Sequence, residues 1–99
     1  MIRYRVEIPR AVRDLIRHLP SGLKAKVKAA LRSIADDPHR AKELREELSG
    51  LRSYRIGRFR VIYRIVESMV QIVALGPRAD IYERAAAELS MSLRRGKTD

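Results

Sequence analysis

Along residues 2–8 apolar positions alternate with charged ones, and this period of two is the pattern of a strand that buries one face. Beyond residue 8 the apolar positions recur every three or four residues. That spacing predicts a short amphipathic helix over residues 9–19. A second amphipathic helix follows, which Ser21 is expected to cap and the run Asp36-Asp37-Pro38 to end. The two helices should form a hairpin whose apolar side lies on a sheet.

The second half of the chain has the composition of strands. Residues 41–48 are mostly charged, and we expect a helical turn or a loop there. The dipeptides Gly57-Arg58 and Glu67-Ser68 are the expected two-residue hairpin turns. Around them β-branched and aromatic residues dominate, and they predict three strands, over residues 51–56, 59–66 and 69–75.

A last amphipathic helix begins at Ile81, and residues 90–99 form a polar, basic tail that should fray. The order strand, helix, helix, three strands, helix predicts an α+β fold. In this fold an antiparallel sheet carries the helical hairpin on one face. At 99 residues the chain is expected to hold a single domain over residues 1–89.

Basic residues outnumber acidic ones, 22 against 12, and the formal net charge is +10. This excess predicts a polyanionic partner, either nucleic acid or an acidic protein or both. The lack of cysteine excludes disulfide frameworks, thiol nucleophiles and cysteine zinc sites. The two histidines have no second ligand at metal spacing, so neither a metal nor another cofactor is expected. No apolar run is long enough to span a membrane, and the expected compartment is the cytoplasm.

Arginines concentrate on the first predicted β-hairpin. Its turn would place Arg55 directly opposite Arg60, and like charges in that arrangement destabilise a strand pair. The second turn would pair Arg60 with Leu75 and bring Arg78 to the same end of the sheet. Tyr82, one helical turn after Arg78, can lie over the same place.

Several arginines in one place are the arrangement expected around a phosphate. Guanidinium groups bind phosphate oxygens in bidentate fashion and stay charged in a partly dry cleft. Function is favoured for Arg60 and Arg78, since nothing else in the sequence compensates their repulsion. Arg58, Arg64 and Arg52 are further candidates for RNA or phosphate contact, although a solvated sheet face is the favoured interpretation of Arg58 and Arg64.

Other chemistries find no support in the sequence. It contains no glycine-rich nucleotide loop, no zinc-protease motif and no Ser/His/Asp set. Two interpretations stay open for Tyr82, which either lies over the arginines or packs in the core. Tyr54 and Tyr63 are expected in the core.

Two runs of residues carry a family resemblance. They are Leu-Ser-Gly-Leu-Arg-Ser-Tyr-Arg-Ile-Gly-Arg-Phe-Arg-Val-Ile-Tyr at 48–63 and Val-Ala-Leu-Gly-Pro-Arg-Ala-Asp-Ile-Tyr at 73–82. With the opening strand and the two helices, the chain resembles the RelE/ParE superfamily of bacterial and archaeal type II toxins over residues 2–86. Within it the RelE branch is favoured.

The resemblance implies a ribosome-dependent endoribonuclease, an mRNA interferase that uses no metal and attacks through the ribose 2′-hydroxyl. Arg60 matches the arginine that holds the scissile phosphate, and Arg78 the arginine after the last strand. Tyr82 matches the tyrosine that stacks on a base and shares in proton transfer. Arg55 stands where the RelE type has a lysine, and the second lysine of that pattern has no counterpart. The general base is therefore unassigned, because arginine is a poor proton acceptor.

The ParE branch is the main alternative, since it shares the fold and inhibits DNA gyrase without a nuclease centre. A plain RNA-binding module or an inactive toxin is the third. In every case the family implies a cognate antitoxin. The charge of +10 favours an acidic, partly disordered antitoxin segment that folds on the basic surface.

Overall fold

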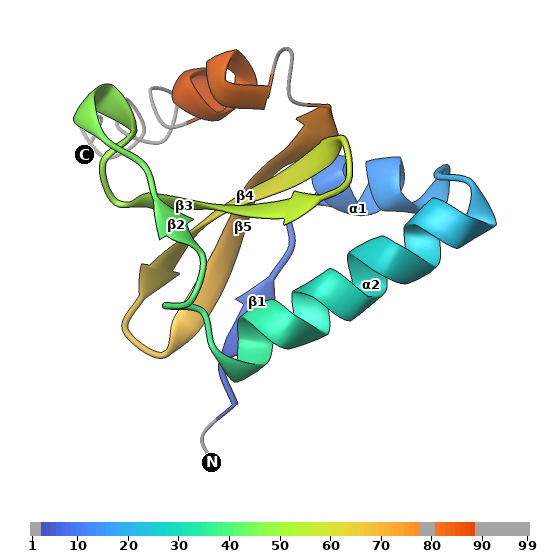
Figure 1. The fold of residues 1–99 in the computed structure, drawn as a ribbon, viewed down its shortest axis with the longest axis horizontal. Coiled ribbons are helices and arrows are strands. Elements are labelled where there is room, and N and C mark those ends of the chain that lie inside the picture. Colours follow the sequence, from blue (N-terminus) through green and yellow to red (C-terminus); the bar gives the residue numbers. More distant parts are fainter. Residues whose placement is uncertain (1–2, 78–80, 89–99) are drawn as a thin grey trace.

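The computed structural model describes residues 3–77 and 81–88 (Figure 1). Its elements in chain order are the strand β1 (Arg5–Glu7), the helices α1 (Arg10–Arg17) and α2 (Ser21–Asp36), the strand β2 (Lys42–Glu43), the 3-10 helix η1 (Glu46–Leu48), and the strands β3 (Leu51–Ile56), β4 (Phe59–Val66) and β5 (Met69–Pro77). Residues 81–88 form a further helical segment. The predicted tail over residues 90–99 lies outside the described residues.

Prolines precede both long helices. Pro9 and Pro20 occupy the N-cap positions of α1 and α2, where the fixed φ of proline and its missing N–H suit the start of a helix. Ser21, expected to cap α2, is instead its first helical residue. Among the elements that the structure describes, no helix is long and apolar enough to cross a membrane.

The strands form one sheet in the order β1-β5-β4-β3-β2, and the predicted α+β fold is confirmed. Neighbouring strands from β2 to β5 pair antiparallel, but β1 lies parallel to β5, with Val6 opposite Val70. The expectation of a wholly antiparallel sheet is wrong for this pair. The helical hairpin and the strands β2, β3 and β4 separate β1 from β5 along the chain, so no short turn dictates the direction of pairing.

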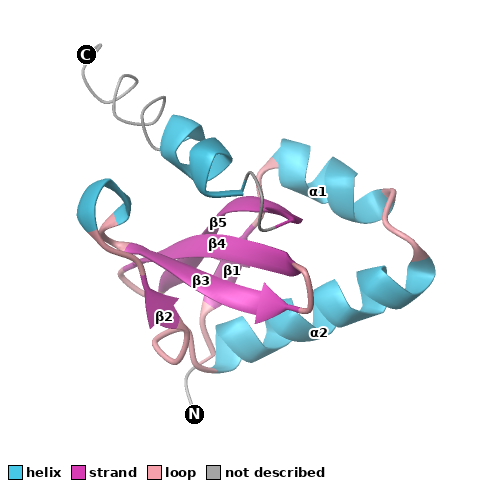
Figure 2. Cartoon of the chain, turned by 45° about the horizontal axis from the view of Figure 1, so that its top comes forward, coloured by secondary structure: helices cyan, strands magenta, loops and turns pink. Residues whose placement is uncertain are grey.

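The two-residue strand β2 extends the sheet where a helical turn or a loop was expected. Lys42 pairs with Ser53 and Glu43 with Arg52, so β2 covers only the first half of β3 at one edge of the sheet (Figure 2). The helical turn is also present, as η1. Both side chains of β2 are exposed, and a strand without a buried face leaves no alternation in the sequence.

Both predicted hairpin turns are confirmed, because the residues that flank each turn pair across it, Ile56 with Phe59 and Val66 with Met69. Gly57 has a φ of 58°, which glycine adopts without penalty. Glu67 has a φ of 56° although it carries a side chain. Residues other than glycine, asparagine and aspartate are disfavoured there, so the second turn holds some backbone strain.

A bulge just after Ile62 shifts the register between β4 and β5 by one residue. The bulge leaves Val73 unpaired. On the far side of the bulge the register is shifted by one, so Arg60 pairs with Gly76. An unbroken ladder predicts Leu75 opposite Arg60, so that predicted partner is wrong by one residue.

The sheet buries apolar residues on both faces. On one, which we call the α2 face, the helices α1 and α2 pack on a cluster of strand residues that comprises Ile56, Val61, Tyr63, Val70, Ile72 and Leu75. On the other, which we call the Arg60 face, a second cluster joins the sheet to residues 81–88 and comprises Leu51, Ile62, Ala74, Ile81 and Ala85. The hairpin of helices thus covers one face as predicted, while residues 81–88 cover the opposite one (Figure 1).

Candidate functional site

Arg55 and Arg60 face each other across β3 and β4, as predicted. Directly paired residues share a face, and so do residues two apart on a strand. Both arginines therefore project from the same face as Ile62. Arg60 is half-buried, and its Nη1 donates a hydrogen bond to Ser53 Oγ at 3.5 Å. Arg55 is exposed, and its Nε donates to the carbonyl oxygen of Gly57 at 3.4 Å.

Neither member of this pair has an acidic partner among the described side chains. The ion pairs found there join Arg3 to Asp36, Arg17 to Asp14 and Arg52 to Glu43. Two guanidinium groups opposite each other repel, and within the described chain only neutral oxygens offset that repulsion. The pair is therefore suited to bind an anion.

A third guanidinium, that of Arg84, lies at the same end of β5. Its Nη1 would be only 2.6 Å from a Cβ atom at position 76, which is the position opposite Arg60. Gly76 leaves the space that this guanidinium occupies. Our sequence reasoning missed Arg84. A usable signal was its spacing, three residues after the buried Ile81, because helical side chains point back toward the start of their helix.

Tyr82 is half-buried and packs against the apolar cluster of the Arg60 face. Core packing accounts for the buried part of the ring, and the exposed part remains open to a ligand. The structure is thus compatible with both interpretations of Tyr82, packing in the core and contact with a ligand beside the arginines. The predicted partner Arg78 lies outside the described residues.

Three further arginines lie on the first hairpin, and two of them are Arg58 and Arg64. Arg58 is exposed in the turn, and its phosphate contact stays a prediction. Arg64 shares the face of Arg60 but lies four residues further along β4, about 13 Å at the usual rise of a strand. Its Nε donates to Gln71 Oε1 at 2.7 Å on the neighbouring strand. We therefore assign Arg64 to cross-strand packing.

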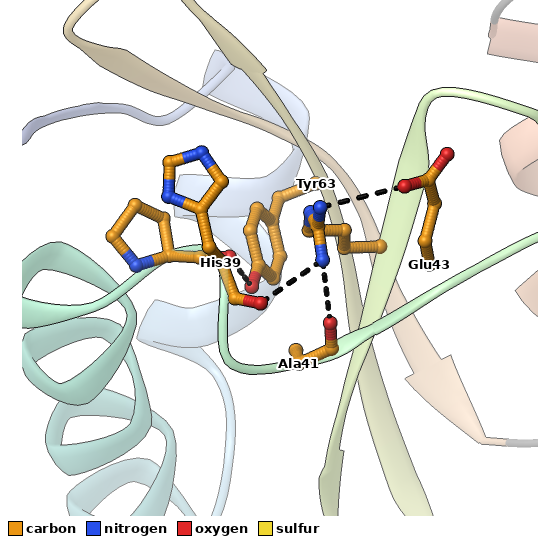
Figure 3. A network of polar contacts seen from close by, with 6 residues as sticks. His39, Ala41, Glu43 and Tyr63 are labelled. Atoms are coloured by element: carbon orange, nitrogen blue, oxygen red, sulfur yellow. Dashed lines mark hydrogen bonds and ion pairs between the residues drawn. The ribbon is translucent and has the colours of Figure 1, made fainter.

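Arg52 lies on the α2 face, because it pairs with the buried Tyr63. Its Nη1 donates to the carbonyl oxygens of His39 and Ala41 at 3.1 and 2.8 Å, and its Nη2 lies 3.4 Å from Glu43 Oε1 (Figure 3). Only 19% of the side chain is exposed. This geometry gives Arg52 a role in the architecture, and its contact with phosphate stays a prediction. Strand alternation turns it to the opposite face, where backbone oxygens and a carboxylate satisfy it.

Tyr63 also binds the loop at 38–41, which accepts the hydrogen bonds of Arg52. Its hydroxyl donates a hydrogen bond of 2.6 Å to the carbonyl oxygen of Pro38. Burial raises the pKa of Tyr63 to about 12, although the nearby charge of Arg52 pulls it the other way. The residue therefore stays protonated at neutral pH. It holds the turn after α2 and is not a proton acceptor for chemistry.

Within the described residues, no group of three histidine, aspartate or glutamate side chains could hold a metal ion. The Arg60 face instead presents guanidinium groups beside one tyrosine. Groups of this kind bind and polarise phosphate oxygens.

Comparison with known proteins identifies the family. The family model of the ParE toxin of the type II toxin-antitoxin system parDE matches residues 2–82. The chain is 42% identical over 77 residues to the toxin RelG of Mycobacterium tuberculosis, a match that covers 75% of this chain and 88% of that toxin. The chain therefore belongs to the RelE/ParE superfamily, the toxins of type II toxin-antitoxin systems, as the sequence resemblance predicted.

Solved structures support the same assignment. The toxin-antitoxin complex RelBE2 of Mycobacterium tuberculosis matches with a TM-score of 0.70 and 33% identity, over 81% of this chain and 97% of that one. The archaeal RelE-RelB complex of Pyrococcus horikoshii matches with a TM-score of 0.64 and 25% identity, over 80% and 98% of the two chains. A mutant of E. coli RelE in the free state has the same fold at 17% identity, with a TM-score of 0.69 over 94% and 97% of the two chains. The likenesses to the two toxin-antitoxin complexes support the RelE-like interpretation, and the likeness to E. coli RelE shows the shared fold.

Proposed function

We propose that this toxin is a ribosome-dependent endoribonuclease that cleaves mRNA without a metal ion. The observation that carries the proposal is the pair of Arg55 and Arg60. These guanidinium groups face each other on one side of the sheet and have no carboxylate partner among the described side chains. The likeness to RelG and to the RelBE2 complex adds support for the RelE branch.

In the proposed reaction the ribose 2′-oxygen forms a bond to the adjacent phosphorus while the bond to the following 5′-oxygen breaks. The products are a 2′,3′-cyclic phosphate and a 5′-hydroxyl end. Negative charge builds up on the non-bridging oxygens, and Arg55, Arg60 and Arg78 are proposed to stabilise it. Preorganised cations aimed at developing charge are among the largest contributions to catalysis.

Two protons must also move, one away from the 2′-hydroxyl and one onto the leaving 5′-oxygen. Arginine keeps its proton at neutral pH, so the arginines act by charge and position. We assign a share in the proton transfer to Tyr82, whose half-buried ring lies on the Arg60 face. The exposed part of the ring is also proposed to stack on a base of the message, as aromatic side chains do with single-stranded RNA.

Inhibition of DNA gyrase is the second candidate function, because the family model that matches residues 2–82 is that of the ParE toxin. In this case the Arg60 face would bind an acidic protein surface, and no bond in RNA would be cleaved. The two candidates differ in target and share the fold.

We further propose that a cognate antitoxin neutralises this toxin in the cytoplasm. The RelBE2 and archaeal RelE-RelB structures are both toxin-antitoxin complexes. The formal net charge of +10 favours a partner segment rich in acidic residues. Ordering of such a segment on the toxin would supply the negative charge that the arginine pair lacks.

The decisive experiment is primer extension on a defined message that is incubated with the toxin in a translating extract. A second reaction contains the same message and toxin without ribosomes, and a third measures gyrase supercoiling. The expected result is a set of discrete new 5′ ends on the translated message alone, with supercoiling unchanged. Intact message in both RNA reactions together with blocked supercoiling would overturn the nuclease and establish the gyrase inhibitor.

A further inference from the structure

Arg84 lies on a different element from the arginine pair and reaches the position opposite Arg60. Its guanidinium Nη1 lies where a side chain at position 76 would begin, at 2.6 Å from the site of the missing Cβ. Position 76 is directly opposite Arg60 in the β4–β5 ladder. Because Gly76 has no side chain, it leaves room for the guanidinium of Arg84, which lies 8 residues later in the sequence.

The helical segment that carries Arg84 is held firmly against the sheet. Ile81 and Ala85, on either side of Arg84 in sequence, are completely buried in the cluster of the Arg60 face. Arg84 itself is exposed. Its side chain reaches over the end of β5 and places the guanidinium above Gly76, the residue opposite Arg60.

No described carboxylate neutralises Arg84. Glu88, one helical turn further on, is exposed, and the ion pairs of the described side chains do not include it. A hollow of about 200 Å³ lies between the start of α1 and the helical segment, and Arg84 and Glu88 are both among the residues that line it. The guanidinium thus lies at the position opposite Arg60 and has no ion-pair partner among the described side chains.

We propose that Arg84, seated on Gly76, contacts a backbone phosphate of the bound RNA next to the one that Arg60 holds. The inference rests on the proposed function, because it takes single-stranded RNA as the ligand of the Arg60 face. Its chemistry is that of a guanidinium and a phosphodiester, which form charge-assisted hydrogen bonds. Gly76 contributes by its lack of a side chain, which leaves the space that the Arg84 guanidinium occupies.

The test measures binding of a short, single-stranded 2′-O-methyl RNA to the purified toxin by fluorescence anisotropy at several salt concentrations. This probe cannot be cleaved through its 2′-oxygens. Each phosphate contact on a single strand adds about 0.7 to the slope of log affinity against log salt. Arg84→Ala should weaken binding about five- to tenfold at low salt and lower the slope by about 0.7.

Gly76→Ala is the matched variant that leaves all the charges in place. Its Cβ would displace the guanidinium, which lies at the end of a flexible side chain, so the fold should persist while binding weakens as in Arg84→Ala. Arg32→Ala is the charge control, because Arg32 is exposed on α2. It should change binding less than twofold. Circular dichroism and thermal unfolding confirm that each variant is folded.

Equal affinities and slopes for Arg84→Ala and Arg32→Ala would overturn the inference, whether or not the toxin cleaves message. Wild-type affinity in Gly76→Ala would overturn it as well, because binding would then not depend on the position of the Arg84 guanidinium above residue 76. Failure of the wild-type toxin to bind the probe at all would also overturn it and leave the face as a protein-binding surface. If message stays intact on ribosomes but Arg84→Ala and Gly76→Ala both weaken binding, the phosphate contact stands and only the nuclease proposal fails.

Discussion

Arg52 and Arg60 belong to the same β-hairpin, yet they lie on opposite faces of the sheet and in opposite electrostatic settings. Arg52 is held by two carbonyl oxygens and a carboxylate, with only 19% of its side chain exposed. Arg60 has one long hydrogen bond to a serine hydroxyl and faces a second arginine. A cation that already has oxygen partners is part of the architecture, whereas a cation that faces another cation is suited to bind an anion.

The role of an arginine in this hairpin therefore depends on its hydrogen-bond and ion-pair partners more than on the number of arginines around it. Both residues lie in a sequence rich in basic side chains, and both were reasonable candidates for phosphate binding. What separates them is the alternation of the strand together with the loop at 38–41, which covers only one face. Substitutions at four positions test the assignments of these side chains and of the two hairpins, and they are ordered from the largest expected effect to the smallest.

Arg60→Ala should have the largest effect, and it should act on activity. Loss of one preorganised donor to a developing oxyanion typically lowers a rate by about 100- to 1000-fold. The free energy of unfolding should stay the same or rise slightly, because repulsion from Arg55 is relieved. The measurements are message cleavage in a translating extract and urea unfolding. Cleavage within tenfold of wild type would refute the role of Arg60, and Arg32→Ala is again the control.

Arg52→Ala should have the opposite profile. It leaves the carbonyl oxygens of His39 and Ala41 without their charged donor and should lower the free energy of unfolding by about 2–3 kcal/mol. Cleavage per folded molecule should not change. Arg52→Lys keeps the charge but cannot reproduce the forked geometry, so its loss of stability should be intermediate. A specific loss of cleavage in stable Arg52 variants would contradict the assignment of Arg52 to the architecture.

Tyr63→Phe should cost about 1–2 kcal/mol at neutral pH, since the carbonyl oxygen of Pro38 loses its hydrogen bond. The difference also has a pH dependence. The folded-state pKa of Tyr63 is raised to about 12, above the ordinary value of 10, so the unfolded chain releases this proton first. The stabilisation is complete below pH 10 and is lost as the pH rises through 12.

Urea unfolding of wild type and Tyr63→Phe at several pH values checks this linkage. The stability difference between the two proteins should be constant up to about pH 9 and shrink between pH 10 and 12. Comparison with the phenylalanine variant removes the contribution of lysines that titrate in the same range. A difference that stays constant across the whole range would refute the raised pKa of Tyr63.

Glu67→Asn should have the smallest effect and should be favourable. Glu67 has a φ of 56° in the second hairpin turn, a conformation that asparagine adopts more readily. The free energy of unfolding should rise by about 0.5–1 kcal/mol, with no change in cleavage. Thermal unfolding measures the gain, and a lower midpoint would show that Glu67 makes a contribution other than its backbone conformation.

The parts of the fold that follow from local pattern were predictable. Alternation and β-branched residues outline β3, β4 and β5, and the two-residue turns align Arg55 with Arg60. Apolar residues at helical spacing outline α1 and α2 within one or two residues of their ends. Such features depend on contacts between residues near in sequence, so a single chain read in order reveals them.

Other features have no local signature. The exposed strand β2 lacks a buried face, the parallel partner of β1 lies at the far end of the chain, and the bulge beside Ile62 changes register without changing composition. The same holds for the candidate site. The sequence predicted the pairing of Arg55 with Arg60. It did not predict that backbone oxygens bind Arg52, or that Arg84 lies at the position opposite Arg60.

By itself the sequence determined the family, the order of elements and the concentration of positive charge on one β-hairpin, because each of these is set by short-range pattern. Only the tertiary structure decided which arginines find acceptor oxygens among the described residues. That decision depends on which loop or helix covers each face of the sheet. The loop at 38–41 supplies oxygens to Arg52, whereas the helical segment at 81–88 brings another cation, Arg84, to the face of Arg60.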